Sequence, residues 1–430
     1  MEISKKKLDI IDAIHRLWSL FCSDSLFRNS VYLMLSTGVM AGFGFIFWII
    51  ATHFYNSEEI GFATALISVT VLISSLSLFG FNSSLIRYLV QSKRPNQMIN
   101  TAMTIVTLST VVLSIIYLFG IEYFSPAFHM LFYKPLYAVL FIIFMIAVSL
   151  NTLTDSVFVA HRLSKYNFIV YTFFGFTKTI LPFFLLSLGA YGVFFSYTGA
   201  VVVAFILSIY FMISRFNYRP AFAIDYESAR QMVSFSLSNY LVGFIFSLPA
   251  ALAPILIVNE LGATDSAYFY MASTIAALLY IIPTAITQSL FAEGAYSEKD
   301  FISFVKKATK FIVLFLLPAI LVVFLLGKYI LLVFGEEYSI NSYYLLQIMA
   351  ISSVFLAINL IGATILRIRH RMMQFLIINI IYLIFTVFLF YLLMPVYGTV
   401  GVAWALLGGQ AFMSACFAIL FSKKLIRLFV

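Results

Sequence analysis

The chain has 430 residues, of which 63% are hydrophobic and only 10% are charged. Soluble globular chains average about 25% charged residues. A water-soluble fold is therefore excluded, because it could not bury this much apolar surface. The net charge of +9 does not predict a nucleic-acid partner, since the basic residues form short clusters between apolar segments. The two cysteines, Cys22 and Cys416, support neither a disulfide framework nor a metal site.

The chain opens with a basic segment that precedes the first apolar window. Residues 8–21 place apolar side chains at helical spacing, which predicts an interfacial helix on the membrane surface, with a disordered cytoplasmic tail as the alternative. A bilayer core about 30 Å thick needs about 20 apolar residues in a helix. The windows that meet this length are 30–52, 60–80, 101–120, 136–159, 167–187, 192–213, 234–258, 267–289, 309–327, 343–365, 373–393 and 399–421.

The placement of charge orients these windows. With a cytoplasmic N-terminus, only Lys134 and Lys328 of the 26 Lys and Arg residues fall in outer loops, and only Lys178 falls inside a span. Membrane proteins generally carry an excess of Lys and Arg on the cytoplasmic side. One span more or fewer would move basic loops to the outer side and destroy this asymmetry. The sequence therefore predicts an all-α polytopic protein of the cytoplasmic membrane, with twelve transmembrane helices and both termini in the cytoplasm.

The two halves of the sequence align at a nearly constant offset. Phe62 aligns with Phe269 at an offset of 207, and Lys165 aligns with Arg371 at an offset of 206. Parallel six-span repeats of this kind are typical of transporters, with substrate at their interface. The predicted organisation comprises an N-terminal segment (1–27), a six-helix bundle (28–215), a cytoplasmic connector (216–230), a second six-helix bundle (231–422) and a cytoplasmic tail (423–430).

Ionisable groups within the apolar windows are costly and usually functional. Lys178 lies about 16 Å into the fifth window, near the midplane, at 1.5 Å per residue. Asp155 lies near the cytoplasmic end of the fourth window, and Asn151 is on the same helix face. Two interpretations remain open and are compatible. Lys178 and Asp155 could form a structural ion pair, or Lys178 could face a cavity and attract an anionic substrate while Asp155 tunes it or binds a coupling cation.

Other polar residues could line a cavity. Arg28 and Arg87 flank spans and could form a cationic vestibule, or could serve only to set topology. Asn239 and Asn359 are amides within spans that could bind substrate, although hydrogen bonding between helices explains most such residues. The chain has no Walker motif and no nucleophile elbow, so we expect neither ATP hydrolysis nor enzymatic activity.

Three stretches of the sequence form recognisable motifs. They are Leu78–Arg87 at the end of span two, Phe334–Tyr338 with a Gly-x-x-Tyr pattern, and Tyr397–Ala403 with a Tyr-Gly-x-x-Gly-x-Ala pattern at the start of span twelve. Together they resemble the polysaccharide flippases of the multidrug/oligosaccharidyl-lipid/polysaccharide exporter superfamily. The resemblance implies two six-helix bundles forming a V around a central cavity. It also implies export of an oligosaccharide linked to a polyprenyl diphosphate, from the inner to the outer leaflet, by alternating access.

The resemblance leaves other functions to be weighed. A cation-coupled multidrug exporter of the same superfamily would carry an acid in span one or seven, where this chain has none. A membrane glycan polymerase would need larger outer loops than this chain has. We expect a monomer without cofactors, for which H⁺ and Na⁺ are the candidate coupling ions. Its expected partners are the lipid-linked oligosaccharide, membrane lipids and the glycosyltransferases and polymerase of the same pathway.

Overall fold

The computed structural model describes residues 25–128, 135–296 and 301–428, and the segment predicted as an interfacial helix (8–21) lies outside these ranges. Helices and turns make up the described residues, and no strand occurs among them. The longer helices are α2 (Ser25–Phe54), α3 (Ser57–Leu78), α5 (Pro95–Phe119), α8 (Pro135–Ala160), α9 (Lys165–Phe184), α10 (Ala190–Phe216), α11 (Tyr226–Glu260), α12 (Ala263–Tyr296), α13 (Phe301–Leu332), α15 (Tyr343–Ile368) and α16 (Met372–Leu428). The short ones are α4 (Phe81–Tyr88), α6 (Ile121–Phe124) and α14 (Glu336–Asn341).

Ten of the described helices are long and apolar enough to cross a membrane. One of them, α16, contains two helices that meet at Gly398, whose φ of 59° and ψ of −140° are not helical. The 20-residue helix α9 is not among the ten, and it packs against α2 and α10. The protein is thus an all-helical, multi-pass membrane protein in the part of the chain that the structure describes.

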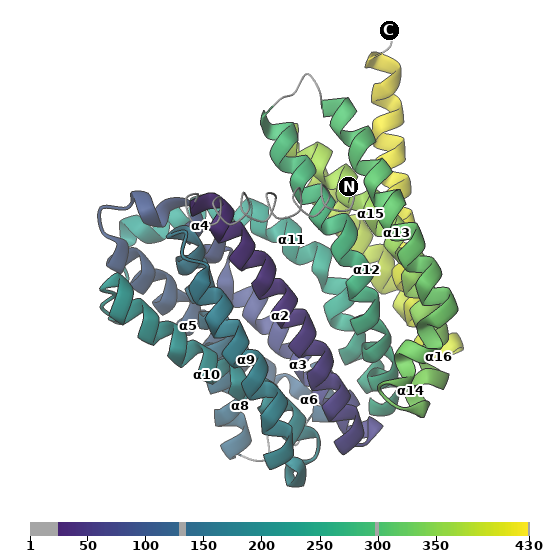
Figure 1. Ribbon diagram of the computed structural model, residues 1–430, viewed down its shortest axis with the longest axis horizontal. Coiled ribbons are helices and arrows are strands. Elements are labelled where there is room, and N and C mark those ends of the chain that lie inside the picture. The colour runs from purple at the N-terminus through teal and green to yellow at the C-terminus, as the bar shows by residue number, and fades with distance from the viewer. Residues whose placement is uncertain (1–24, 129–134, 297–300, 429–430) are drawn as a thin grey trace, which may run out of the picture.

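Consecutive long helices run in opposite directions, so their connections gather at two ends of the molecule (Figure 1). We call one the basic end, and its residues include Arg87, Lys93, Arg94, Arg162, Lys165, Arg215, Arg219, Arg367, Arg369 and Arg371. We call the other the acidic end, and its residues include Glu58, Glu59, Glu122, Glu260, Asp265, Glu336 and Glu337.

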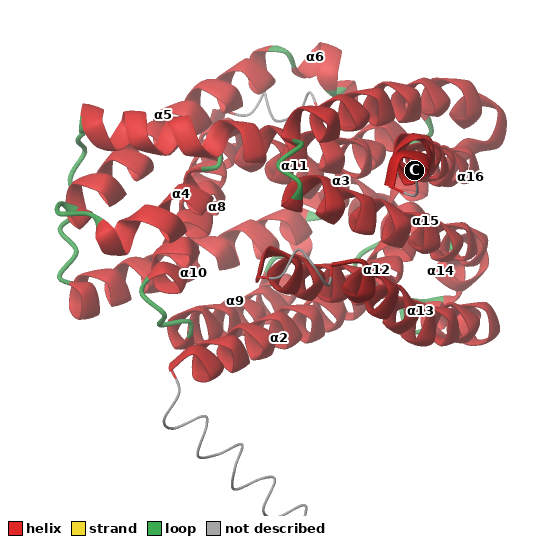
Figure 2. Ribbon diagram, turned by 90° about the horizontal axis from the view of Figure 1, so that it is seen from above, coloured by secondary structure: helices red, strands yellow, loops and turns green. Residues whose placement is uncertain are grey.

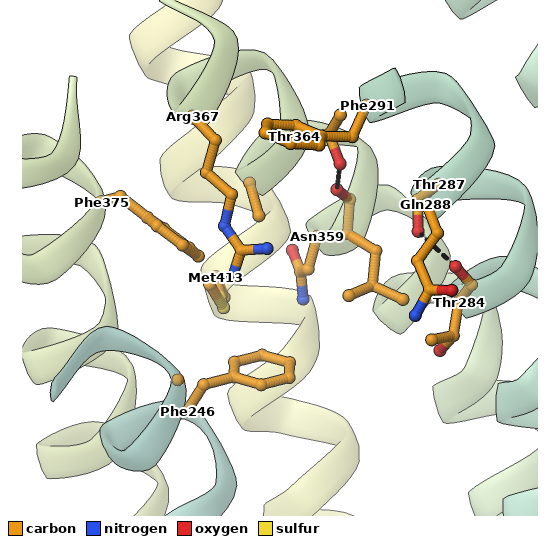
Figure 3. A pocket seen from close by; sticks show the side chains of 13 residues that line it. Phe246, Thr284, Thr287, Gln288, Phe291, Asn359, Thr364, Arg367, Phe375 and Met413 are labelled. Carbon is orange, nitrogen blue, oxygen red and sulfur yellow. Dashed lines mark hydrogen bonds between the residues drawn. The ribbon is translucent and has the colours of Figure 1, made fainter. Parts of the chain in front are cut away.

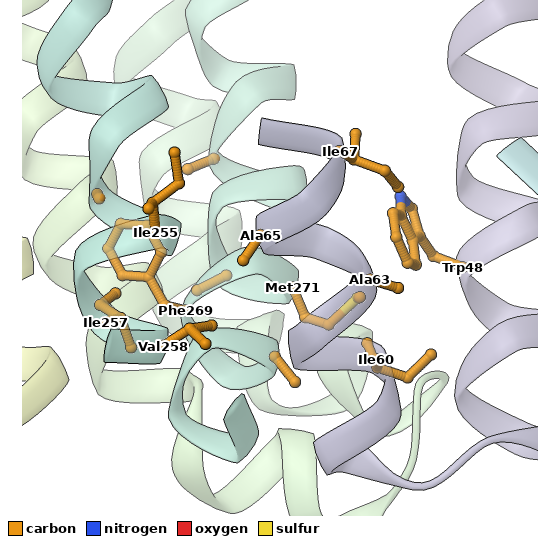
Figure 4. Close-up of a cluster of buried hydrophobic side chains, with 14 of the residues drawn as sticks. Trp48, Ile60, Ala63, Ala65, Ile67, Ile255, Ile257, Val258, Phe269 and Met271 are labelled. Carbon is orange, nitrogen blue, oxygen red and sulfur yellow. The ribbon is translucent and has the colours of Figure 1, made fainter. Parts of the chain in front are cut away.

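The helices form a first bundle from α2 to α10 and a second from α11 to α16 (Figure 1). Seen from above, α3 and α11 occupy the middle of the molecule (Figure 2). At this junction α3 packs against α11 and α12, and Ala65 of α3 lies on the side that faces Ile255 and Phe269 (Figure 4). A single buried apolar cluster therefore joins the two bundles through α3.

Toward the basic end the buried clusters are separate. One lies in the first bundle, includes Phe81 and Val157, and also contains Met232 at the start of α11. Two smaller ones lie in the second bundle, around Phe417 and around Leu290. Helices in a membrane associate through close packing and hydrogen bonds. The large cluster therefore joins the bundles at the acidic end, whereas toward the basic end the start of α11 makes the contact, with Ser84 Oγ donating to the Met232 carbonyl (3.0 Å).

A sharp turn follows the end of α3. The helix ends at Leu78, within two residues of the end of the predicted window 60–80. Phe79 and Gly80 then both adopt positive φ values of 46° and 75°, which end an α-helix. Arg87 consequently lies on a separate short helix, α4.

The segment 217–225 connects the two bundles and is held against α5. Asn100 donates from Nδ2 to the carbonyl of Arg219 (3.0 Å) and accepts from the hydroxyl of Tyr218 (2.6 Å). Asp225 ends the segment by capping α11, since its carboxylate accepts from the backbone N–H of Ser228 (2.9 Å). The hydrogen bonds that the hydroxyl and the backbone N–H of Ser228 donate to Asp225 lower the pKa of this carboxyl. The connector is therefore attached to the first bundle.

A glycine permits the close contact at the acidic end. A Cβ added to Gly61 of α3 would clash with the carbonyl of Ala263 at the start of α12, whereas one added to Gly42 would meet nothing within 4 Å. We expect Gly61→Ala to destabilise the protein by about 1–3 kcal/mol, as overpacking does, and to separate α3 from α12. Unfolding in detergent and the distance between spin labels on cysteines at Glu58 of α3 and Asp265 of α12 measure the two effects. Gly42→Ala is the control, and equal behaviour of the two variants would contradict the proposed close contact.

Candidate functional site

Two adjoining hollows lie where the bundles meet. The central cavity, about 410 Å³, is lined by α11, α12, α15 and α16 and by Ser68 of α3. Its walls are mostly aromatic and aliphatic, and Tyr280 and Gln410 contribute polar atoms. A groove between α2 and α12 shares Tyr270 and Ser273 with this cavity. The hollows thus form one region bordered by both bundles.

A third hollow, which we call the Arg367 cavity, lies in the second bundle and has a volume of about 310 Å³. Phe246 borders both it and the central cavity, so the two are neighbours. The Arg367 guanidinium points into the hollow, and its carbon lies 5.3 Å from the centre of the Phe375 ring (Figure 3). Gln288 and Asn359 add amides to the lining. The site therefore combines one cation, two amides and aromatic walls.

The direction of α15 explains why Arg367 points inward. Side chains of a helix lean toward its N-terminus, and α15 begins at Tyr343 near the acidic end. The Arg367 side chain, in the last turn, consequently extends back into the bundle instead of out of the basic end (Figure 3). No Asp or Glu lines any of the three hollows in the described part of the chain. The lining is suited to an anionic ligand.

Asn359 belongs to a hydrogen-bonded network between α15 and α16. It donates to Gln410 Oε1 (2.6 Å) and accepts from Ser414 Oγ (2.9 Å), while Gln410 Nε2 donates to the hydroxyl of Tyr382 (3.1 Å). Asn359 lines the Arg367 cavity and Gln410 lines the central cavity. The network therefore forms part of the wall between the two hollows.

Lys178 belongs to α9 in the first bundle, and its side chain lies against α2. Its side chain is 4% exposed, and Nζ lies 4.7 Å from the Phe174 ring, 5.8 Å from that of Phe47 and 6.0 Å from that of Tyr197. A Cβ on Gly44 would lie 3.9 Å from Nζ, and Gly44 lines the groove between α2 and α12. The ammonium is thus held by aromatic rings, which attract cations, just behind the wall of the groove.

Asp155 and Lys178 do not meet in this conformation. The Asp155 carboxylate accepts from the hydroxyl of Tyr171 (2.7 Å), and Tyr171 lies two helical turns before Lys178 on α9. No ion pair joins Asp155 and Lys178 in the described part of the structure. Asn151 lies one turn before Asp155 on α8.

The remaining predicted residues are spread over the molecule. Arg28 is in the first turns of α2, and the guanidinium of Arg87 lies 5.4 Å from the Tyr88 ring on α4. Both are near the basic end, away from the linings of the three hollows. The side chain of Asn239 lies outside the described residues. Of the predicted residues, only Asn359 lines a described hollow directly.

The charge pattern of the sequence does not distinguish Arg367 from Arg369 and Arg371, because all three follow the predicted span 343–365 and fit the cytoplasmic excess of basic residues. A signal was nevertheless present. Asn359, Ala363 and Arg367 follow one another at intervals of four residues, which places them on one face of a helix.

Solved transporter structures share this arrangement of helices. A multidrug resistance MATE family transporter of the MOP superfamily, in an inward-facing conformation, is 14% identical with a TM-score of 0.70, over 93% of this chain and 98% of that one. The lipid II flippase MurJ is 15% identical with a TM-score of 0.70, over 92% and 87%. A MOP superfamily transporter from Pyrococcus furiosus is 14% identical with a TM-score of 0.63, over 94% and 96%. The chain therefore has the fold of the MOP superfamily transporters.

The sequence places the chain within a particular family. Residues 26–292, more than half of the chain, match the family of polysaccharide biosynthesis proteins. The chain belongs to that family, as the resemblance of its motifs predicted. No curated protein sequence matches the chain.

The network around Asn359 can be tested by substitution. We expect Asn359→Leu to destabilise the protein by about 1–3 kcal/mol, because it removes the donor to Gln410 Oε1 and one of the acceptors of the Ser414 hydroxyl. Unfolding in detergent measures this change. Asn341→Ala is the matched control, since Asn341 is exposed on α14 and donates only to the Glu337 carbonyl. Equal losses for the two variants would show that the network does not stabilise the wall.

Proposed function

We propose that the protein is a flippase that moves an oligosaccharide linked to a polyprenyl diphosphate from the inner to the outer leaflet of the cytoplasmic membrane. Its cargo would serve the biosynthesis of a cell-surface polysaccharide of the O-antigen or capsule type. The family match and the transporter fold support this class of activity. The observation that carries the proposal is the lining of the hollows, which holds one cation and no acid among the described residues.

The polarity of this lining also separates the proposal from its main alternative. A multidrug exporter of the same superfamily has a comparable fold. An exporter of cationic drugs needs an acid in its cavity, since a buried cation is costly unless it is paired. A diphosphate instead needs donors, and Arg forms bidentate, charge-assisted hydrogen bonds with phosphate groups. Arg367 therefore favours the lipid-linked cargo.

We propose twelve spans in two parallel repeats. The count adds the helix α9 to the ten candidate helices and treats the two helices of α16 as separate spans. Several backbone features support this. The helices that begin at Ser57 and Pro95 have counterparts, 206 positions later, that begin at Ala263 and Phe301. Gly189 (φ 56°, ψ −132°) and Gly398 (φ 59°, ψ −140°) adopt the same unusual conformation before the sixth and twelfth spans.

The orientation follows from charge. We place the basic end and both termini in the cytoplasm, because Lys and Arg are in excess on that side of membrane proteins. Toward this end the bundles make only the smaller contact at the start of α11, and at the other they are joined by the cluster that includes Ile60 and Phe269. This conformation would admit cargo from the inner leaflet, and alternating access would then require α3 to part from α11 and α12. Lys178, behind Gly44, would attract the diphosphate as the bundles move.

Reconstituted protein should move a fluorescent polyprenyl-diphosphate saccharide between leaflets, and Arg367→Gln should slow this about 10–100-fold. That range corresponds to the loss of a charge-assisted hydrogen-bonded pair of about 1.5–3 kcal/mol. Arg367→Lys should retain part of the rate, because it keeps the charge without the bidentate geometry. Arg369→Gln is the control, since Arg369 directly follows the end of α15 and lines none of the three hollows. Equal rates for the Arg367→Gln and Arg369→Gln variants would reject the anionic-cargo site.

Lys178 makes a separate test of the same mechanism. Lys178→Met keeps the aliphatic stem among its aromatic neighbours but removes the charge. We expect this variant to fold and to flip the saccharide at least about tenfold more slowly, as measured in the same liposomes. Transport at the wild-type rate would show that the ammonium has only a structural role.

A further inference from the structure

A separate groove, with a volume of about 400 Å³, lies between α5 and α10 toward the basic end of the first bundle. Its walls are Met103, Thr104 and Thr107 of α5, Phe205 and Ile209 of α10, and residues 218 and 220–222 of the connector. No Asp or Glu lines the groove in the described part of the chain, and none of its residues lines the three hollows of the candidate site. The groove is therefore an open, mostly apolar site of its own.

The connector is held in a fixed position beside this groove. Asn217, with a φ of 51°, ends α10 in the left-handed conformation, and the chain then crosses to α5. The backbone N–H of Arg219 donates to Asn96 Oδ1 (3.4 Å), and its carbonyl accepts from Asn100 Nδ2 (3.0 Å). The N–H of Ala221 donates to Asn100 Oδ1 (3.2 Å). Linkers between domains usually make few contacts, so the attachment of this one indicates a role beyond joining the bundles.

The connector and the residue that follows it carry large apolar side chains that contact little of the protein. Phe222 is 75% exposed, Ile224 is 54% exposed and Tyr226, at the start of α11, is 78% exposed. Aromatic side chains are typical of the layer where a membrane meets water, because their rings lie at the level of the lipid headgroups. These side chains therefore place the connector against the membrane surface.

Arg219 adds a positive charge at the edge of the groove. It stands between Tyr218 and Pro220, which both line the groove, and its side chain is exposed. Its guanidinium makes no hydrogen bond to the described residues, whereas its backbone is fixed on both sides. Arg forms bidentate, charge-assisted hydrogen bonds with phosphate groups, and basic residues beside a membrane attract anionic lipids. An apolar groove that ends at such a residue matches a ligand with an apolar chain and an anionic head.

We propose that the groove binds an anionic phospholipid, with one acyl chain between α5 and α10 and the phosphate at Arg219. Both helices are long and apolar enough to cross the membrane, so lipids are the molecules that reach the space between them. The bound lipid would also hold the connector, which leads directly into α11, against the first bundle. Binding does not depend on the proposed function. Only the assignment of this lipid to the inner leaflet rests on the proposed orientation.

Binding can be measured without transport. In protein exchanged into lipid-free neutral detergent, phosphatidylglycerol should raise the unfolding temperature in a saturable way, because a ligand of the folded state stabilises it. Phosphatidylcholine with the same acyl chains should raise it less. Arg219→Gln should weaken the apparent Kd for phosphatidylglycerol about fivefold, as expected for one basic residue beside an anionic lipid. Thr107→Trp, which fills the groove with a side chain, should weaken it at least about tenfold.

Matched variants and a second readout keep the test specific. Arg230→Gln removes an exposed charge of α11, and Leu108→Trp enlarges an exposed side chain of α5. Neither residue lines the groove, so both variants should respond to phosphatidylglycerol as the wild type does. Native mass spectrometry counts the lipid bound to each protein, so that reduced stability of a variant is not mistaken for reduced binding.

Four results would overturn the site. Equal effects of the two lipids on the wild type would show that the headgroup is not recognised. Equal weakening by Arg219→Gln and Arg230→Gln would reduce the effect to general attraction between charges. Full binding by Thr107→Trp would remove the acyl chain from the groove. Displacement of phosphatidylglycerol by an equimolar amount of a polyprenyl diphosphate would assign the groove to that class of lipid in place of a phospholipid.

Discussion

The packing of α3 against α11 and α12 is the constraint on which the rest of the molecule depends. Gly61 brings two backbones together there, and the cluster around Ile60 and Phe269 extends the contact into both bundles. The edge-on packing of Trp48 on Tyr270, with ring centres 4.9 Å apart, continues it between α2 and α12. Small residues allow such close approach between helices in a membrane. Toward the basic end the described bundles meet only where the start of α11 packs against α4 and α5, a smaller contact that includes Met232.

The membrane architecture was readable from the sequence because it depends on composition. Apolar length and the alternation of charge are properties of whole segments, and the observed helices follow the predicted windows closely. The predicted window 60–80 ends within two residues of the observed helix end at Leu78. The left-handed conformation of Phe79 and Gly80 could not be predicted in the same way, because hydropathy carries no information about backbone conformation.

The candidate site was harder to predict because it depends on direction and on neighbours. The depth of Lys178 in its helix was predictable from position, but the rings that surround it come from three different helices: Phe174 from α9, Phe47 from α2 and Tyr197 from α10. For Arg367 the position in the sequence is uninformative, because a basic residue at the end of a span is typical of a solvated charge. In the structure its side chain points back along α15, so that the guanidinium lies in a cavity (Figure 3).

The charged groups are divided between the bundles in a way that suits a two-state transporter. Arg367 belongs to the second bundle, whereas Asp155 and Lys178 belong to the first. Neither bundle neutralises the other in this conformation, because no described ion pair joins these residues. A ligand that contacts charged groups of both bundles would therefore favour one relative placement of the bundles, since a ligand shifts an equilibrium only through its different affinities for the two states.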